Sequence, residues 1–206
     1  GLQMAVQVAD VLSASGHDIA AVVTSPLERA RETGAPTAAA FGLTPRTDVR
    51  LIEAGNHFEG IPVNRNRWVL AHPEHWRYYL NPLRPSWGES YAELVERVSG
   101  AVRDAIEPVE GREALLVSHQ LPVWATRLWL EGRPLVHDPR HRQCSLASLT
   151  SLTFDDRTLV GLSYWEPAGD LLRRAEDMVP GTSAAAEATG RVTGLAPVDG
   201  ASAPAG

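Results

Sequence analysis

Residues 24–33 read Thr-Ser-Pro-Leu-Glu-Arg-Ala-Arg-Glu-Thr and decide how the first half of the chain folds. They follow the apolar run 19–23, which is typical of a short buried strand. Ser25 suits a helix N-cap, Pro26 suits the first helical position, and Glu28 completes a capping box. The stretch therefore predicts a strand, a tight turn and a helix.

Arg29 lies in the first turn of this expected helix, near the positive end of the helix dipole. A phosphate group there would be held by the helix end and by the guanidinium together. The alternative is an ordinary capped helix whose Arg29 and Arg31 lie in solvent. Taken alone, the stretch supports the two interpretations equally.

A second strand-to-helix turn lies at residues 114–122, which read Ala-Leu-Leu-Val-Ser-His-Gln-Leu-Pro. His119 stands at the carboxyl end of the expected strand. In open α/β sheets ligands bind beyond the carboxyl ends of the strands, so Arg29 and His119 are expected to face one site. A lone histidine after a strand is more often structural, but its pairing with the arginine turn favours a functional role.

Together these turns resemble the histidine phosphatase superfamily, in its phosphoglycerate mutase-like branch. The resemblance spans roughly residues 1–167 and is uninformative about the substrate. The segments that carry it are Ser-Pro-Leu-Glu-Arg-Ala-Arg-Glu-Thr at 25–33, Leu-Ile-Glu at 51–53 with Phe-Glu-Gly at 58–60, Gly-Glu-Ser-Tyr at 88–91 and Val-Ser-His at 117–119.

The resemblance implies a phosphomonoester hydrolase that acts through a phosphohistidine intermediate, without metal or other cofactor, on a small phosphorylated substrate. It implies that Arg29 and a protonated His119 stabilise the transferring phosphoryl group. Gln120, where the family often has a small residue, is assigned with them to phosphate binding. Glu53 is expected to protonate the departing alkoxide, although the segment from Glu53 to Gly60 is one residue shorter than the family pattern.

The family's nucleophile is a histidine in an Arg-His-Gly motif, and this sequence contains no such motif. A helical apolar stripe of Leu2, Val6, Ala9 and Leu12 is already under way at the first residue. We therefore expect an N-terminally truncated and inactive chain that lacks the first strand and the nucleophile. Two alternatives stay open: a phosphoglycerate mutase-type phosphotransferase, and a non-catalytic module that binds anions or another protein.

The composition narrows the class of protein. The chain has 206 residues, 44% of them hydrophobic, which is enough for one substantial core. The net charge is −6 and no lysine is present, which argues against a nucleic-acid surface. No apolar run is long enough to span a membrane, and the single Cys144 cannot form an internal disulfide. We expect a cytoplasmic protein, with a homo-oligomer possible.

The alternation of strand and helix patterns predicts a three-layer α/β/α sandwich, with a mostly parallel sheet and an antiparallel hairpin at one edge. Proline interrupts the histidine pairs His72/His75 and His137/His141, so no metal site is predicted. One domain is expected over 1–167, followed by a largely disordered tail over 168–206. The expected elements are helices at 1–15, 26–41, 89–106 and 121–131, strands at 19–23, 48–52, 114–118, 146–154 and 158–165, and a helical insertion at 61–87.

Overall fold

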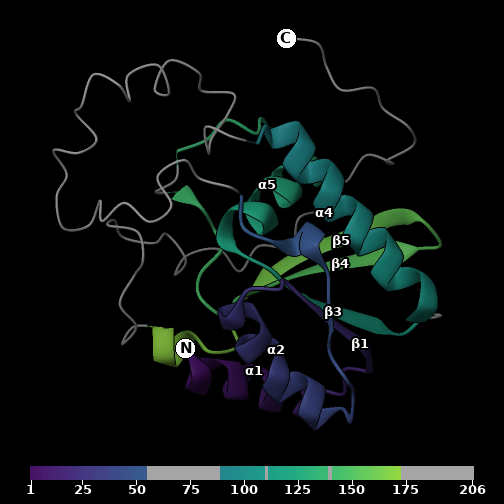
Figure 1. Ribbon diagram of the computed structural model, residues 1–206, viewed down its shortest axis with the longest axis vertical. Helices are drawn as coiled ribbons and strands as arrows, with labels where there is room; N and C mark the ends of the chain where they lie inside the picture. Colours follow the sequence, from purple (N-terminus) through teal and green to yellow (C-terminus); the bar gives the residue numbers. More distant parts are fainter. Residues whose placement is uncertain (55–88, 110, 139–140, 173–206) are drawn as a thin grey trace, which may run out of the picture.

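The computed structural model describes residues 1–54, 89–109, 111–138 and 141–172 (Figure 1). The expected insertion at 61–87, the pair His72/His75 and the tail from 173 onward lie outside these residues. The elements are α1 (Leu2–Ala14), β1 (Ile19–Thr24), α2 (Glu28–Ala40), β2 (Arg46–Thr47), the 3₁₀ helix η1 (Val49–Leu51), α4 (Tyr91–Ile106), the 3₁₀ helix η4 (Glu107–Val109), β3 (Glu113–Val117), α5 (Gln120–Leu130), β4 (Leu149–Asp155), β5 (Thr158–Trp165) and α6 (Gly169–Leu172).

The strands form a parallel sheet and a separate antiparallel hairpin. The parallel sheet is three-stranded in the order β2-β1-β3. Thr24 at the end of β1 is in register with Thr47 of β2 and with Val117 of β3, so all three strands end at one edge. The α/β fold with a mostly parallel sheet is confirmed. The hairpin β4-β5 pairs by itself and is not hydrogen-bonded to the other described strands.

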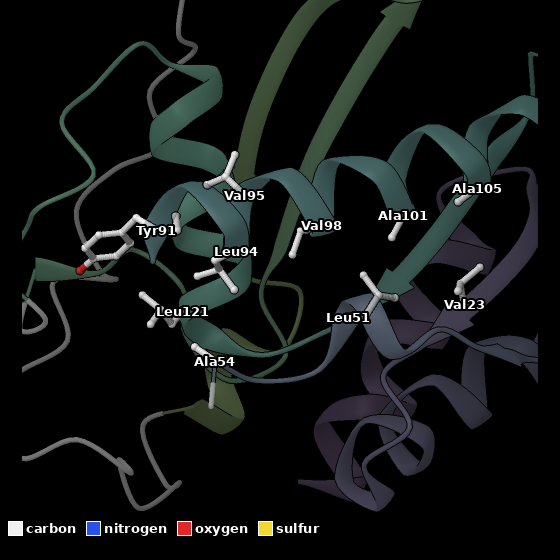
Figure 2. Close-up of a cluster of buried hydrophobic side chains, with 11 residues drawn as sticks. Val23, Leu51, Ala54, Tyr91, Leu94, Val95, Val98, Ala101, Ala105 and Leu121 are labelled. Carbon is white, nitrogen blue, oxygen red and sulfur yellow. The ribbon is translucent and has the colours of Figure 1, made fainter. Parts of the chain in front are cut away.

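Helices cover both faces of the parallel sheet: α1 and α2 lie on one side, and α4 and α5 on the other (Figure 1). Side chains of successive residues of β1 point to opposite faces of the sheet, because side chains alternate along a strand. Val22 packs with Ile19 and Ala38 on the α2 side, whereas Val23 joins the cluster beneath α4 (Figure 2). That second cluster contains Val23, Leu51, Ala54, Tyr91, Leu94, Val95, Val98, Ala101, Ala105, Leu121 and Ala125.

Helix α2 approaches the sheet closely at Gly34. A Cβ built on this glycine would lie 2.7 Å from Thr24 Cγ2 and 3.3 Å from Val117 Cγ2. Glycine suits this approach, since a methyl group there would overlap the Thr24 side chain of β1 and press tightly on Val117 of β3. The contact fixes the height of α2, and therefore of Arg29, above the ends of β1 and β3.

Two expectations about local structure are wrong. Helix α2 begins at Glu28 with Leu27 as its N-cap, so Ser25, Pro26 and Glu28 do not form the expected cap. Residues 48–52 form no strand, because the Asp48 carboxylate accepts a hydrogen bond from the Arg50 N–H at 2.8 Å and closes a turn into η1.

Of the apolar stripe expected on the first helix, Ala9 and Leu12 are buried but Leu2 and Val6 are not. Leu2 and Val6 are 67% and 44% exposed, while the buried face consists of Met4, Ala5, Val8, Ala9 and Leu12. Burial of neighbouring pairs one turn apart is typical of a helix packed flat on another helix, and α1 packs on α2. Inward residues of α4 are as expected: Tyr91, Leu94, Val95 and Val98 are all buried.

The hairpin is tied to the N-terminal part of the chain. Gln7 Nε2 donates to the Pro167 carbonyl at 3.1 Å, and the Trp165 indole stacks on the His17 ring with centroids 5.9 Å apart.

Among the described residues no helix is long and apolar enough to cross a membrane. No cluster of three or more histidine, cysteine, aspartate or glutamate side chains suited to a metal ion occurs in the same part of the chain.

Candidate active site

The parallel register of β1 and β3 brings two short turns together at the carboxyl edge of the sheet. The N–H of Ser25, the first residue after β1, donates to the Val117 carbonyl at 2.8 Å. His119 follows β3 by one further residue and is the N-cap of α5, without a side-chain cap of its own. The N-termini of α2 and α5 therefore both lie at this edge, where their dipoles favour an anion.

His119 connects the two turns through both of its ring nitrogens. Arg29 Nε donates to His119 Nδ1 at 3.2 Å. Since Nδ1 accepts, the proton of the neutral ring sits on Nε2, which donates to Ser25 Oγ at 2.8 Å. The structure thus brings Arg29 and His119 into direct contact. The Ser25 hydroxyl accepts from His119 and also, at 3.4 Å, from the N–H of Leu27, the N-cap of α2.

The surroundings of His119 oppose the protonation that is expected for its role in phosphate binding. Burial of the ring and the nearby charges of Arg29 and Arg97 lower the pKa of His119 from 6.5 to about 4. At neutral pH the imidazole is therefore neutral and accepts at Nδ1. A phosphate dianion would supply the negative charge that is missing here, so protonation of His119 is expected to accompany anion binding.

Glu53 lies close to the same cations. Its Oε1 accepts a hydrogen bond from the Ala54 N–H at 3.0 Å, and the side chain is half-buried. Burial raises the pKa of Glu53, against the opposing effects of the Ala54 N–H and of Arg29, Arg142 and Arg97. A carboxyl group with a raised pKa is suited to donate a proton near neutral pH.

A hydrogen bond from the end of β3 holds the segment that carries Glu53. Ser118 Oγ donates to the Leu51 carbonyl at 2.7 Å, one residue before His119. Arg97 Nη1 donates to the neighbouring Arg50 carbonyl. The carboxyl therefore follows a short 3₁₀ helix that is hydrogen-bonded to Ser118 and to Arg97 of α4, and it does not lie at the end of a strand.

Sequence reasoning missed two arginines, Arg97 of α4 and Arg142. Arg97 is bound in a bidentate manner by Glu89, at 2.5 and 2.9 Å. Glu89 belongs to the Gly-Glu-Ser-Tyr segment that carried the family resemblance, so a signal for its arginine was present. Arg142 follows a histidine-containing stretch that was considered only for metal binding, and no spacing rule links it to Glu53.

The side chain of Gln120 lies between Arg142 and the backbone. Its Nε2 donates to the Cys144 carbonyl at 3.2 Å, and its Oε1 accepts from Arg142 Nη1 at 3.4 Å. Both ends of the amide are thus engaged within the protein. Any direct phosphate contact from this residue would come from its backbone N–H in the first turn of α5.

The described residues offer a cradle for an anion and a proton donor, but no activated nucleophile. Ser25 is 0% exposed, so its hydroxyl is out of reach of a substrate. Burial raises the pKa of the Cys144 thiol to about 11, which keeps it protonated and unreactive at neutral pH. The geometry supports binding and acid–base chemistry on a phosphate ester.

A family model described as histidine phosphatase superfamily (branch 1) matches residues 1–166. The chain belongs to this superfamily. The family resemblance of the sequence is confirmed, and histidine phosphatases are phosphatases and mutases. Two related sequences and one solved structure are similar to this chain.

The uncharacterized protein Rv0525 of Mycobacterium tuberculosis is 47% identical over 168 residues, which cover 82% of each chain. The probable phosphoglycerate mutase GpmB of Yersinia pestis is 29% identical over 161 residues, or 76% of this histidine phosphatase chain and 70% of its own. The native structure of mycobacterial glucosyl-3-phosphoglycerate phosphatase Rv2419c superposes with a TM-score of 0.62 at 24% identity, covering 81% of this chain and 85% of the other. That likeness shows the shared fold.

Proposed function

We propose that this protein is a phosphomonoester hydrolase that acts on small phosphorylated molecules through a phosphohistidine intermediate. The observation that carries the proposal is the contact of Arg29 Nε with His119 Nδ1, at 3.2 Å, where β1 and β3 end. The exposed guanidinium of Arg29 forms no ion pair within the described residues. Its charge is therefore available to a phosphate group.

In the proposed reaction a histidine nitrogen attacks the phosphorus in line, so a nitrogen–phosphorus bond forms as the ester oxygen–phosphorus bond breaks. Glu53, which is protonated at the start, gives its proton to the departing alkoxide. Water then attacks the phosphohistidine, Glu53 takes its proton, and the nitrogen–phosphorus bond breaks to release phosphate. Arg29 and His119 donate to the equatorial oxygens throughout and stabilise their charge.

The nucleophile in this proposal belongs to an Arg-His-Gly segment, which the sequence does not contain. Without it the chain binds the anion and turns over no substrate. Strand β3 pairs with β1 alone among the described strands. We propose that a further strand, central in the sheet, carries the nucleophile into the site.

The binding half of the proposal is tested on the chain itself by titrating inorganic phosphate in a calorimeter. Arg29→Ala should weaken phosphate binding by about tenfold or more, because a charge-assisted hydrogen bond contributes about 1.5–3 kcal/mol. Arg31→Ala is the matched control: it lies two residues further along α2, is exposed, and should leave the affinity unchanged. Equal affinities of the two variants would refute the cradle.

The catalytic half is tested in the protein supplied with an Arg-His-Gly strand. Glu53→Gln should lower turnover of an alkyl phosphate by about 10²–10⁴-fold, and turnover of p-nitrophenyl phosphate much less, because the second leaving group needs no proton. Equal losses on both substrates would count against Glu53 as the proton donor. Transfer of the phosphoryl group to a second hydroxyl, instead of to water, would identify a mutase, the activity named for the Yersinia relative.

A further inference from the structure

Arg142 is a half-buried cation that forms no ion pair with any residue in the part of the chain that the structure describes. Three other arginines in the described part of the chain are buried or half-buried, and each has a carboxylate partner: Arg50 with Asp48, Arg97 with Glu89 and Arg127 with Glu131. Apart from Arg142, every described arginine that lacks a carboxylate partner is exposed. Withdrawing a guanidinium from water without a counter-charge is unfavourable, so an unpaired one at a site is suited to an anionic ligand.

The position of Arg142 places its guanidinium beside the phosphate cradle. Its Nη1 lies 3.4 Å from Oε1 of Gln120, the residue that follows His119. Its charge also acts on Glu53, where it opposes, together with Arg29, the rise in pKa that burial causes. Arg142 therefore lies near the carboxyl that is proposed to protonate the leaving group.

The guanidinium is also held in a fixed orientation. Arg142 Nε donates to His137 Nε2 at 2.8 Å, and His137 Nδ1 in turn donates to the Leu135 carbonyl at 2.7 Å. The His137 ring packs against Tyr91 and Trp124, with ring centroids 5.8 and 6.0 Å away. These contacts use Nε and one N–H of Nη1, and they leave the Nη2 edge of the guanidinium for a ligand.

From these observations we propose that Arg142 binds a second anionic group, a carboxylate or a phosphate, on the leaving-group side of the substrate. The site then selects phosphomonoesters that carry two anions. This inference rests on the proposed function, because the first anion is the phosphate held by Arg29 and His119. It assigns to Arg142 a role in specificity and none in the transfer itself.

The test is calorimetric binding of three probes to the unaltered chain: inorganic phosphate, phosphoglycolate and 2-hydroxyethyl phosphate. Phosphoglycolate and 2-hydroxyethyl phosphate differ in a carboxylate against a neutral hydroxymethyl group. The chain should bind phosphoglycolate about tenfold to a hundredfold more tightly than 2-hydroxyethyl phosphate, the range expected for one charge-assisted hydrogen bond. Ethane-1,2-diol bisphosphate in place of phosphoglycolate shows whether a phosphate or a carboxylate is preferred as the second group.

Arg142→Gln should abolish this preference and leave the affinity for inorganic phosphate within about twofold, whereas Arg142→Lys should retain part of the preference. Arg103→Gln is the control and should behave as the unaltered chain, because Arg103 of α4 is exposed and forms no ion pair among the described residues. An unaltered chain that binds phosphate but does not distinguish the two esters refutes the inference alone. An Arg142→Gln loss that is equal for all probes also refutes it, and a chain that binds none of them refutes the proposed function as well.

Discussion

The neutral His119 predicts that the protein loses stability in mild acid. The pKa of this side chain is 6.5 in an unfolded chain and about 4 in the fold. Above pH 6.5 both states are neutral, and the hydrogen bonds of His119 contribute fully. As the pH falls from 6.5 toward 4, the unfolded chain gains a proton that the folded chain refuses, so unfolding becomes more favourable.

The size of the effect follows from the two pKa values. A full lowering from 6.5 to about 4 is worth about 3 kcal/mol at 1.36 kcal/mol per pH unit. Between pH 7.5 and pH 5 the expected loss in the free energy of unfolding is about 2 kcal/mol from this residue. The pKa of His137 is also lowered, by burial, so the unaltered protein has a second contribution of the same sign.

Urea denaturation at pH 7.5 and pH 5, on the unaltered chain and on His119→Gln, separates the two contributions. Glutamine keeps a donor for Ser25 Oγ but has no proton to gain. The loss of stability on acidification should therefore be about 2 kcal/mol smaller in His119→Gln. The same loss in both proteins would refute the assignment of a neutral, buried His119, whatever the absolute stability of the variant.

Two further changes test the packing and the local structure around the site. Gly34→Ala should destabilise the fold by about 1–3 kcal/mol, since its methyl would lie 2.7 Å from Thr24 Cγ2. Gly100→Ala in α4 should be neutral or stabilising by up to about 1 kcal/mol, because its methyl meets only the ends of Arg50 and Arg103, at 3.4 and 3.8 Å. Thermal unfolding midpoints that shift in the same direction for both variants would contradict this. Ser90→Ala removes the hydroxyl that accepts from the Glu93 N–H and should cost about 1 kcal/mol in urea denaturation, and an unchanged midpoint would argue against the capping box.

Sequence patterns predicted the parts of the fold whose signals are local. The apolar runs at 19–23 and 114–118 correspond to β1 and β3, and the helical period of Tyr91, Leu94, Val95 and Val98 corresponds to the buried face of α4. The meeting of Arg29 and His119 was also predictable, because parallel strands end at one edge of a sheet.

The errors arose where a distant residue changed the local preference. Ser25 and Glu28 have the spacing of a capping box, but the Ser25 hydroxyl is bound by His119, 94 residues away, and the helix starts later. The charge of His119 depends on burial and on two arginines from other elements, so no local pattern predicts it. Arg142 reaches the site only through tertiary contacts with His137 and Gln120.

The hydrogen bond from Ser118 Oγ to the Leu51 carbonyl has a consequence for how the chemistry depends on the core. Leu51 is 1% exposed and packs beneath α4, and Glu53 stands only two residues further along the chain (Figure 2). A substitution that opens a cavity at Leu51 would let the Glu53 carboxyl change position. Arg29 and His119 would keep their positions, because they lie on other segments. Mutations deep in the hydrophobic interior should therefore alter how fast a leaving group departs before they alter how tightly an anion is held.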